Sequence, residues 1–122
     1  VLLPKIKQQL DKIGEEYEII IVDTMKSLDD TPAVCKKFGA RYVNQRLPHF
    51  GGAFRTGIKA ARYDKFLIMD SDGSHNPIYI PDIYKKFVSG ADVVIGSRYV
   101  KGGKTNDSKV SIIMSHILNF VF

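Results

Sequence analysis

Two aspartates separated by one residue are the clearest chemical signal in the chain. Asp70 ends the apolar run KFLIMD, and Asp72 follows in the segment DSDGSHNP. Carboxylates this close repel each other unless a proton or a cation lies between them. Mg²⁺ or Mn²⁺ fits, because such cations take carboxylates together with phosphate oxygens and water. The spacing therefore favours a divalent cation on a diphosphate. The alternative is a solvated turn, for which Asp72–Gly73 is also suited.

Alternating helical and extended patterns indicate the elements that position this pair. They predict an α/β fold whose mostly parallel sheet carries helices on both faces. In such sheets ligands bind beyond the carboxyl ends of the strands, where Asp23, Asp70 and Arg98 are expected. The predicted strands are YEIIIVD (17–23), ARYVNQ (40–45), KFLIMD (65–70) and ADVVIGS (91–97). Helices are predicted at about 2–13, 51–61, 81–89 and 110–122, and a short helix is predicted to begin near 30–31 with Pro32 in its first turn.

Composition narrows the function classes without choosing one. The formal net charge of +5 attracts phosphates, whether of a nucleotide, a lipid or a nucleic acid. A lone Cys35 excludes an internal disulfide and a cysteine-built zinc site. The longest apolar-leaning stretch, 110–122, is shorter than the about 20 residues that a membrane-spanning helix needs. We therefore expect one domain with no spanning segment of its own.

Four segments together resemble a known enzyme family. IIIVDTMKSLDDT, GGAFRTGIKAA, FLIMDSDGSHNPIYIPDIY and DVVIGSRYVKGG occur in the order found in family 2 glycosyltransferases of the GT-A fold. The last two are most similar to dolichyl- and other polyprenyl-phosphate mannosyl- or glucosyltransferases. The resemblance runs from about Tyr17 to Gly103. It implies that residues 1–122 are part of a catalytic domain, truncated at both ends.

On the donor side, the resemblance implies a nucleotide-sugar site of the GDP-mannose or UDP-glucose class. Asp23 contacts the base or ribose, unless it only caps a helix. Gly51, Gly52 and Ala53 let the backbone approach the nucleotide, unless the glycines only form a turn, and Arg55 supports that loop. The loop after the third strand binds the diphosphate and holds Mg²⁺ or Mn²⁺. The residues implied there are Asp70 and Ser71 for the nucleotide sugar, Asp70, Asp72 and Ser74 for the metal, and Asp72 for catalysis.

On the acceptor side, the resemblance implies a lipid phosphate rather than nucleic acid. Arg98 acts in catalysis and faces the acceptor phosphate with Lys101 and Lys104, unless Arg98 pairs with a surface carboxylate. A phosphate monoester has a second pKa near 6, so at neutral pH it is already an anionic nucleophile and needs no general base. Direct displacement would invert the anomeric centre. The implied location is cytoplasmic, at the cytoplasmic face of a membrane.

Other interpretations remain open at this point. DSDGS also fits the strand end of HAD-type phosphatases, although no later strand carries the acidic pair that such enzymes need. A receiver-like module or an inactive nucleotide-binding fragment is a further alternative. His75 either lines the donor pocket or, as we favour, braces the loop. The family's first strand, expected between the 17–23 and 65–70 strands, has no counterpart here, and direct pairing of those two would contradict this interpretation.

Overall fold

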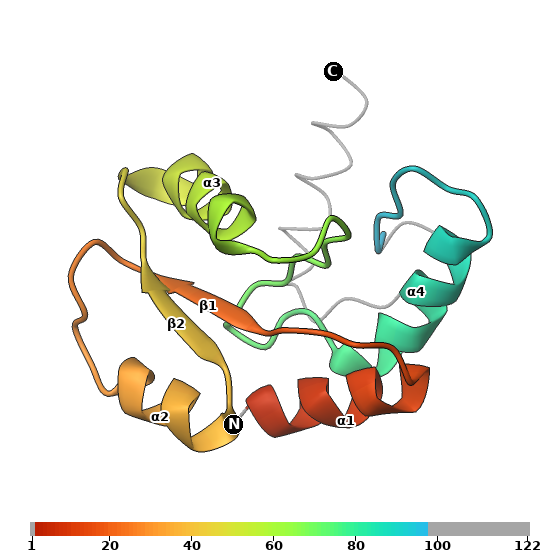
Figure 1. The fold of residues 1–122 in the computed structure, drawn as a ribbon, viewed down its shortest axis with the longest axis horizontal. Helices are drawn as coiled ribbons and strands as arrows, with labels where there is room; N and C mark the ends of the chain where they lie inside the picture. Colours follow the sequence, from red (N-terminus) through yellow and green to blue (C-terminus); the bar gives the residue numbers. More distant parts are fainter. Residues whose placement is uncertain (1, 98–122) are drawn as a thin grey trace, which may run out of the picture.

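The computed structural model describes residues 2–97, so Arg98, Lys101, Lys104 and the helix predicted at 110–122 lie outside the described residues. Figure 1 shows the arrangement of the elements. In chain order they are α1 (Leu3–Ile13), β1 (Ile20–Asp23), α2 (Thr31–Phe38), β2 (Arg41–Asn44), α3 (His49–Ala60), the 3₁₀ turn η1 (Pro77–Tyr79) and α4 (Ile80–Val88).

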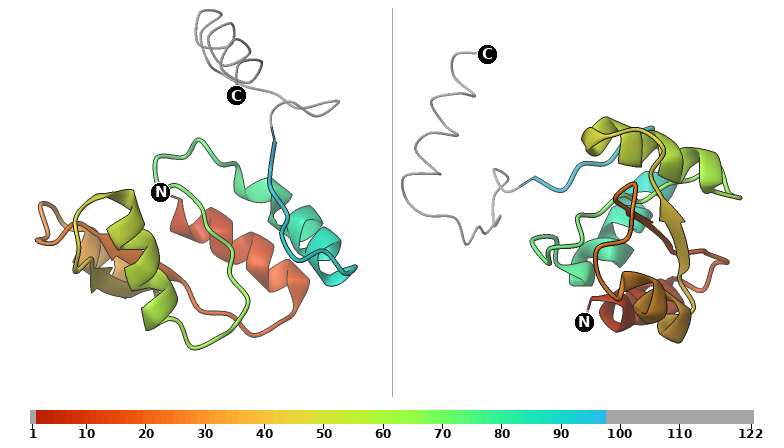
Figure 2. Two further views of the ribbon diagram at one scale, coloured as in Figure 1. Left: turned by 90° about the horizontal axis from the view of Figure 1, so that it is seen from above. Right: turned by 90° about the vertical axis from the view of Figure 1, so that its left-hand side faces the viewer.

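A two-stranded parallel sheet lies at the centre of the fold. β1 and β2 pair in a register that sets Ile20 beside Arg41 and Asp23 beside Asn44. α3 covers one side of this sheet, and α1 and α2 lie on the other (Figures 1 and 2). The predicted α/β class, the parallel pairing and the helices on both faces are therefore confirmed.

The predictions of a third and a fourth strand are wrong. Segments 65–70 and 91–97 are not strands, and within residues 2–97 neither forms a backbone ladder with β1 or β2. Their apolar side chains stay exposed: the exposed fraction is 50% for Ile68 and 80% for Ile95. An apolar run becomes a strand only where a neighbouring strand accepts its hydrogen bonds. Direct pairing of 65–70 with β1 is thereby excluded.

Helix ends follow local signals, as the sequence predicted. α1 ends at Gly14, which adopts a left-handed conformation with φ of 77°. α1 packs against η1 and α4, and Leu3 of α1 and Ile80 of α4 are both buried. No helix among residues 2–97 is long and apolar enough to cross a membrane. This small core thus joins α1 to the much later η1 and α4.

The start of α3 differs from the prediction, because the helix begins at His49 rather than at Gly51. Gly51 and Gly52 therefore lie in its first turns. A Cβ at Gly52 would overlap the carbonyl oxygen of Leu47, whereas a Cβ at Gly51 would meet nothing within 4 Å. The loop from β2 folds directly onto Gly52, and this close approach fixes where α3 begins.

We predict opposite effects of alanine at these two neighbouring glycines. Gly52→Ala should lower the free energy of unfolding by about 1–3 kcal/mol, because the loop must move away from the new methyl group. Gly51→Ala should leave it unchanged or raise it by up to about 1 kcal/mol, since alanine favours a helix. Chemical denaturation of both variants measures the difference. Equal effects would contradict the close approach at Gly52.

Candidate functional site

The Asp23 carboxylate is held at the carboxyl end of β1 by two donors. The backbone N–H of Thr24 donates to Oδ1 at 2.7 Å, and the Tyr42 hydroxyl donates to Oδ2 at 2.9 Å. Asp23 is half-buried, so it still presents part of its carboxylate to solvent. The alternative that Asp23 caps a helix is not what the described contacts show. The carboxylate is instead fixed in orientation at the edge of the sheet.

Tyr42 and Asn44 extend this arrangement, and the sequence analysis missed both. The Asn44 side-chain amide donates to the Tyr42 hydroxyl oxygen at 2.8 Å and to the carbonyl of Thr24 at 2.8 Å. Residues two apart in a strand lie on one face, so Tyr42 and Asn44 project together. A polar residue at the end of β2, directly beside Asp23 in the register, was the signal that could have identified them.

The first turn of α3 opens at this same edge, because α3 follows β2. No side chain caps it: Pro48 at the N-cap position makes no side-chain hydrogen bond. The first backbone N–H groups of a helix have no partner within the helix and carry its positive end, which suits an anion. Counted from the start of α3, these groups belong to His49, Phe50, Gly51 and Gly52, whereas Ala53 is the fifth residue and lies within the helical hydrogen-bond pattern. Arg55 is exposed further along the helix.

His49 begins α3 in an unusual conformation. Its φ of 67° is positive, which makes it the one described residue other than glycine in the left-handed region. Backbone conformations of this kind cost about 1–3 kcal/mol and occur often near functional sites. The sequence analysis gave His49 no role. Its place between the β2 loop and the first turn of α3 makes it part of this edge.

Residues 70–75 form a loop, called the acidic loop here, in which a hydrogen bond holds the Asp72 carboxylate. Oδ1 of Asp72 accepts the Ser74 backbone N–H at 2.8 Å. Hydrogen bonds from the backbone and side chain of Ser74 lower the pKa of Asp72, so it is ionised at neutral pH. Asp72 is exposed. Ser74 therefore orients Asp72, while its implied role as a direct metal ligand stays a prediction.

His75 braces the loop, as we favoured from the sequence. Its Nδ1 accepts the backbone N–H of Asp70 at 3.2 Å. Its Nε2 lies 3.8 Å from Oδ2 of Asp70, which is too far for a hydrogen bond. The Asp70 side chain is 55% exposed. Both aspartates of the pair thus face solvent from a loop whose ends are tied together.

The carboxylates of the acidic loop fit a divalent cation that is bound together with a nucleotide, rather than one held by protein ligands alone. Among residues 2–97, no group of three or more His, Cys, Asp or Glu side chains could hold a metal ion. Mg²⁺ is commonly bound by one or two carboxylates, with substrate phosphates and water completing its coordination. Asp70 and Asp72 offer two carboxylates exposed to a ligand.

Ser71 links the acidic loop to the sheet. It lines a small apolar cavity of about 160 Å³ together with Leu3 of α1, Ile21 of β1 and Cys35 of α2. The start of the acidic loop therefore lies beside β1. The structure brings Asp23, Tyr42 and Asn44 together through hydrogen bonds, and it places Ser71 near the same strand. The first turn of α3 follows β2 at the same end of the sheet, without a hydrogen bond to these three side chains among residues 2–97.

The sequence is also similar to a known family and to several known proteins. The model of glycosyl transferase family 2 matches residues 2–121. A dolichol-phosphate mannosyltransferase of Pyrococcus furiosus is 38% identical over 99 residues, covering 77% of this chain and 28% of the relative. A dolichyl-phosphate hexose transferase of Haloferax volcanii is 32% identical over 97 residues, covering 79% of this chain and 42% of the relative.

An uncharacterized glycosyltransferase of Mycobacterium tuberculosis is also 32% identical, over 104 residues that make up 80% of this chain and 47% of that protein. No solved structure gives a significant match. The chain thus spans less than half the length of these three relatives. Since the family model covers nearly all of it, the chain belongs to glycosyl transferase family 2.

Proposed function

We propose that this chain forms the donor-binding part of an enzyme that moves a hexose from a nucleoside-diphosphate sugar to a dolichyl or other polyprenyl phosphate. Family membership supports sugar transfer over the phosphatase and receiver-like alternatives. The names of the Pyrococcus and Haloferax relatives support the lipid-phosphate acceptor. The observation that carries the proposal is the exposed Asp70–Asp72 pair, with Asp72 held ionised by Ser74.

The donor would extend along the edge where β1 and β2 end. Asp23 has a fixed carboxylate that can accept hydrogen bonds from a base or a ribose. The uncapped first turn of α3 offers N–H groups to phosphate oxygens, and Arg55 is exposed nearby. Asp70 and Asp72 would hold Mg²⁺ or Mn²⁺ on the diphosphate. A divalent ion there would offset the charge of the departing nucleoside diphosphate.

The acceptor side concerns residues beyond the described part of the chain. Arg98, Lys101 and Lys104 are proposed to orient the lipid phosphate, because cations bind phosphate oxygens strongly. The acceptor is already largely anionic at neutral pH, so the protein has to position it rather than deprotonate it. Displacement at the anomeric carbon would then invert its configuration. We propose a location at the cytoplasmic face of a membrane, because the proposed acceptor is a membrane lipid.

We predict metal-dependent nucleotide binding that depends on both aspartates. GDP or UDP should bind in the presence of Mn²⁺ and lose affinity when EDTA is added. Asp70→Asn and Asp72→Asn should each weaken metal-dependent binding by at least the roughly 10- to 100-fold that loss of an outer ligand partner costs. Isothermal titration calorimetry measures both effects.

The matched control is Asp64→Asn, which removes the same charge from an exposed position outside the acidic loop. It should bind nucleotide as the parent chain does. Nucleotide affinity that is unchanged by EDTA and by both loop substitutions would sink the proposal. If the unsubstituted chain bound no nucleotide at all, the interpretation as an inactive fragment would be favoured.

A second prediction concerns Tyr42 as the residue that positions Asp23. Tyr42→Phe removes the hydroxyl that donates to Asp23, which should weaken nucleotide binding by about 1 kcal/mol, roughly fivefold. Asp23→Asn should weaken it too, and the double variant should lose less than the two single losses combined, because both act through one carboxylate.

Tyr63→Phe is the control, since its hydroxyl donates to Glu16 at 3.3 Å, away from this edge. Additive losses in the Tyr42 and Asp23 variants would show that Tyr42 acts independently of Asp23. Thermal unfolding of each variant separates an effect on binding from an effect on folding.

A third prediction tests the membrane side. The protein should float with vesicles that contain phosphatidylglycerol, and less with phosphatidylcholine alone. Combined Lys101→Gln and Lys104→Gln should reduce partitioning roughly 30-fold, at about 1 kcal/mol for each lysine near an anionic surface. The control combines Lys85→Gln and Lys86→Gln on α4. An equal loss of partitioning in this control would show that net charge alone, and not the position of Lys101 and Lys104, determines vesicle binding.

A further inference from the structure

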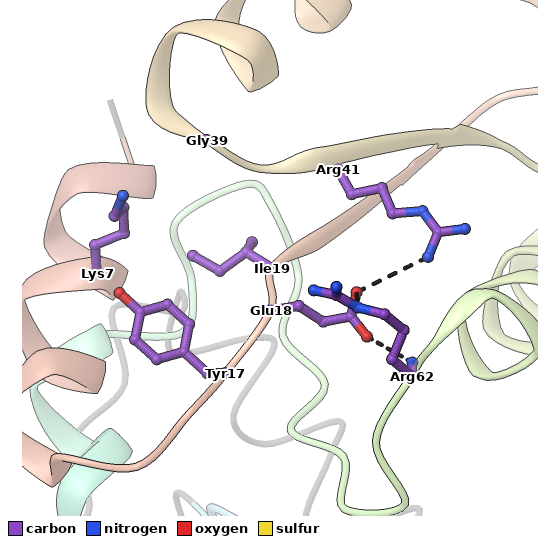
Figure 3. A pocket seen from close by; sticks show the side chains of 7 residues that line it. All are labelled: Lys7, Tyr17, Glu18, Ile19, Gly39, Arg41 and Arg62. Carbon is purple, nitrogen blue, oxygen red and sulfur yellow. Dashed lines mark hydrogen bonds and ion pairs between the residues drawn. The ribbon is translucent and has the colours of Figure 1, made fainter.

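A charged cavity opens at the edge of the sheet opposite to the candidate donor site. It has a volume of about 410 Å³ and lies where β1 and β2 begin. Figure 3 shows that its wall combines Lys7 of α1, Glu18 just before β1, Arg41 at the start of β2 and Arg62 just after α3. Segments distant in sequence thus contribute to one hollow of the size typical for small-molecule ligands.

Glu18 organises the cations on one side of this cavity. Its side chain is only 9% exposed, and it accepts the Arg62 backbone N–H at 2.6 Å and Arg62 Nε at 3.2 Å. Arg41 Nη1 lies 3.8 Å from the same carboxylate and donates to the Ala60 carbonyl at 2.6 Å. Both guanidinium groups are thereby held at the wall, while half or more of each side chain stays exposed.

Lys7 approaches from the opposite wall. Its ammonium donates to the Phe38 carbonyl at the end of α2, at 3.2 Å. Gly39 lies beside the ammonium: a Cβ at Gly39 would be 3.7 Å from the Lys7 nitrogen, an ordinary van der Waals contact. An ammonium has three donors, and this contact uses one of them. Tyr17 completes this wall, and its hydroxyl donates a hydrogen bond to Asp11 Oδ1 at 2.6 Å, which raises the pKa of the hydroxyl.

The lining therefore presents more positive charge and more donors than it can satisfy itself. Three cations face the single carboxylate of Glu18 among the residues that line the cavity. Guanidinium and ammonium groups in combination suit phosphate oxygens, the first by paired N–H donors and the second as a point charge. We propose that this cavity binds the phosphate groups of a small ligand, at a site separate from the candidate donor site.

The test titrates pyrophosphate into the chain in the presence of EDTA, which excludes the metal-dependent donor site. Lys7→Gln and Arg62→Gln should each lower affinity about tenfold, and the backbone amide signals of Ile19 and Gly39 should shift on binding. Lys5→Gln is the matched control: it removes the same charge from an exposed position on the same helix. It should change affinity little, and Asp72→Asn should not weaken binding.

Equal weakening by Lys5→Gln and Lys7→Gln, or no binding by the parent chain, would overturn the proposal. Because Arg62 also holds Glu18, thermal unfolding is measured for each variant, and Lys7→Gln carries the test if Arg62→Gln is destabilised. Flotation with phosphatidylglycerol vesicles distinguishes the source of the phosphate. A loss in Lys7→Gln for vesicles as well as pyrophosphate assigns the site to a lipid headgroup, and a loss for pyrophosphate alone assigns it to a soluble ligand.

Discussion

The parallel register between β1 and β2 determines which polar groups meet at the two ends of this sheet. It places Asp23 beside Asn44 and Ile20 beside Arg41. At the carboxyl end, Tyr42 and Asn44 can therefore reach Asp23 and Thr24 across the two strands. A shift of one residue would turn these side chains to the other face and separate them. The candidate donor site thus depends on four paired residues in each strand.

The two ends of this sheet use charge in different ways. At the amino end, the nearly buried Glu18 ties the start of β1 to Arg62 and, more loosely, to Arg41. The Glu18 carboxylate also accepts the backbone N–H of Arg62, so it links the segment before β1 to the end of α3. Asp70 and Asp72 of the acidic loop are exposed, and no Lys or Arg among residues 2–97 forms an ion pair with either of them. Glu18 is thus neutralised by arginines of the protein, whereas the carboxylates of the acidic loop remain accessible to a cation.

Sequence patterns predicted what depends on local interactions. Gly14 and Pro32 marked helix ends correctly, because capping and proline geometry act within a few residues. The 65–70 and 91–97 runs were predicted as strands from composition, but pairing is a property of two segments, and they have no ladder within residues 2–97. Asp23, Asp70 and Asp72 were predicted as site residues because they follow apolar runs in the sequence. Tyr42, Asn44 and the Glu18 contacts were missed because each joins residues at least 19 positions apart, except the Asn44–Tyr42 bond.

The acidic loop shows how a site can be prepared without a buried ligand set. His75 fixes the backbone at Asp70, and Ser74 fixes the carboxylate of Asp72. Both restraints are short-range, so the loop does not need the 65–70 segment to be paired in order to keep its shape. A loop ordered in advance loses less conformational freedom when a ligand binds, which increases affinity without adding contacts. The same reasoning applies to Asp23, whose carboxylate is oriented by Tyr42 without any ligand. Donor affinity should therefore depend on these supporting residues as well as on the carboxylates themselves.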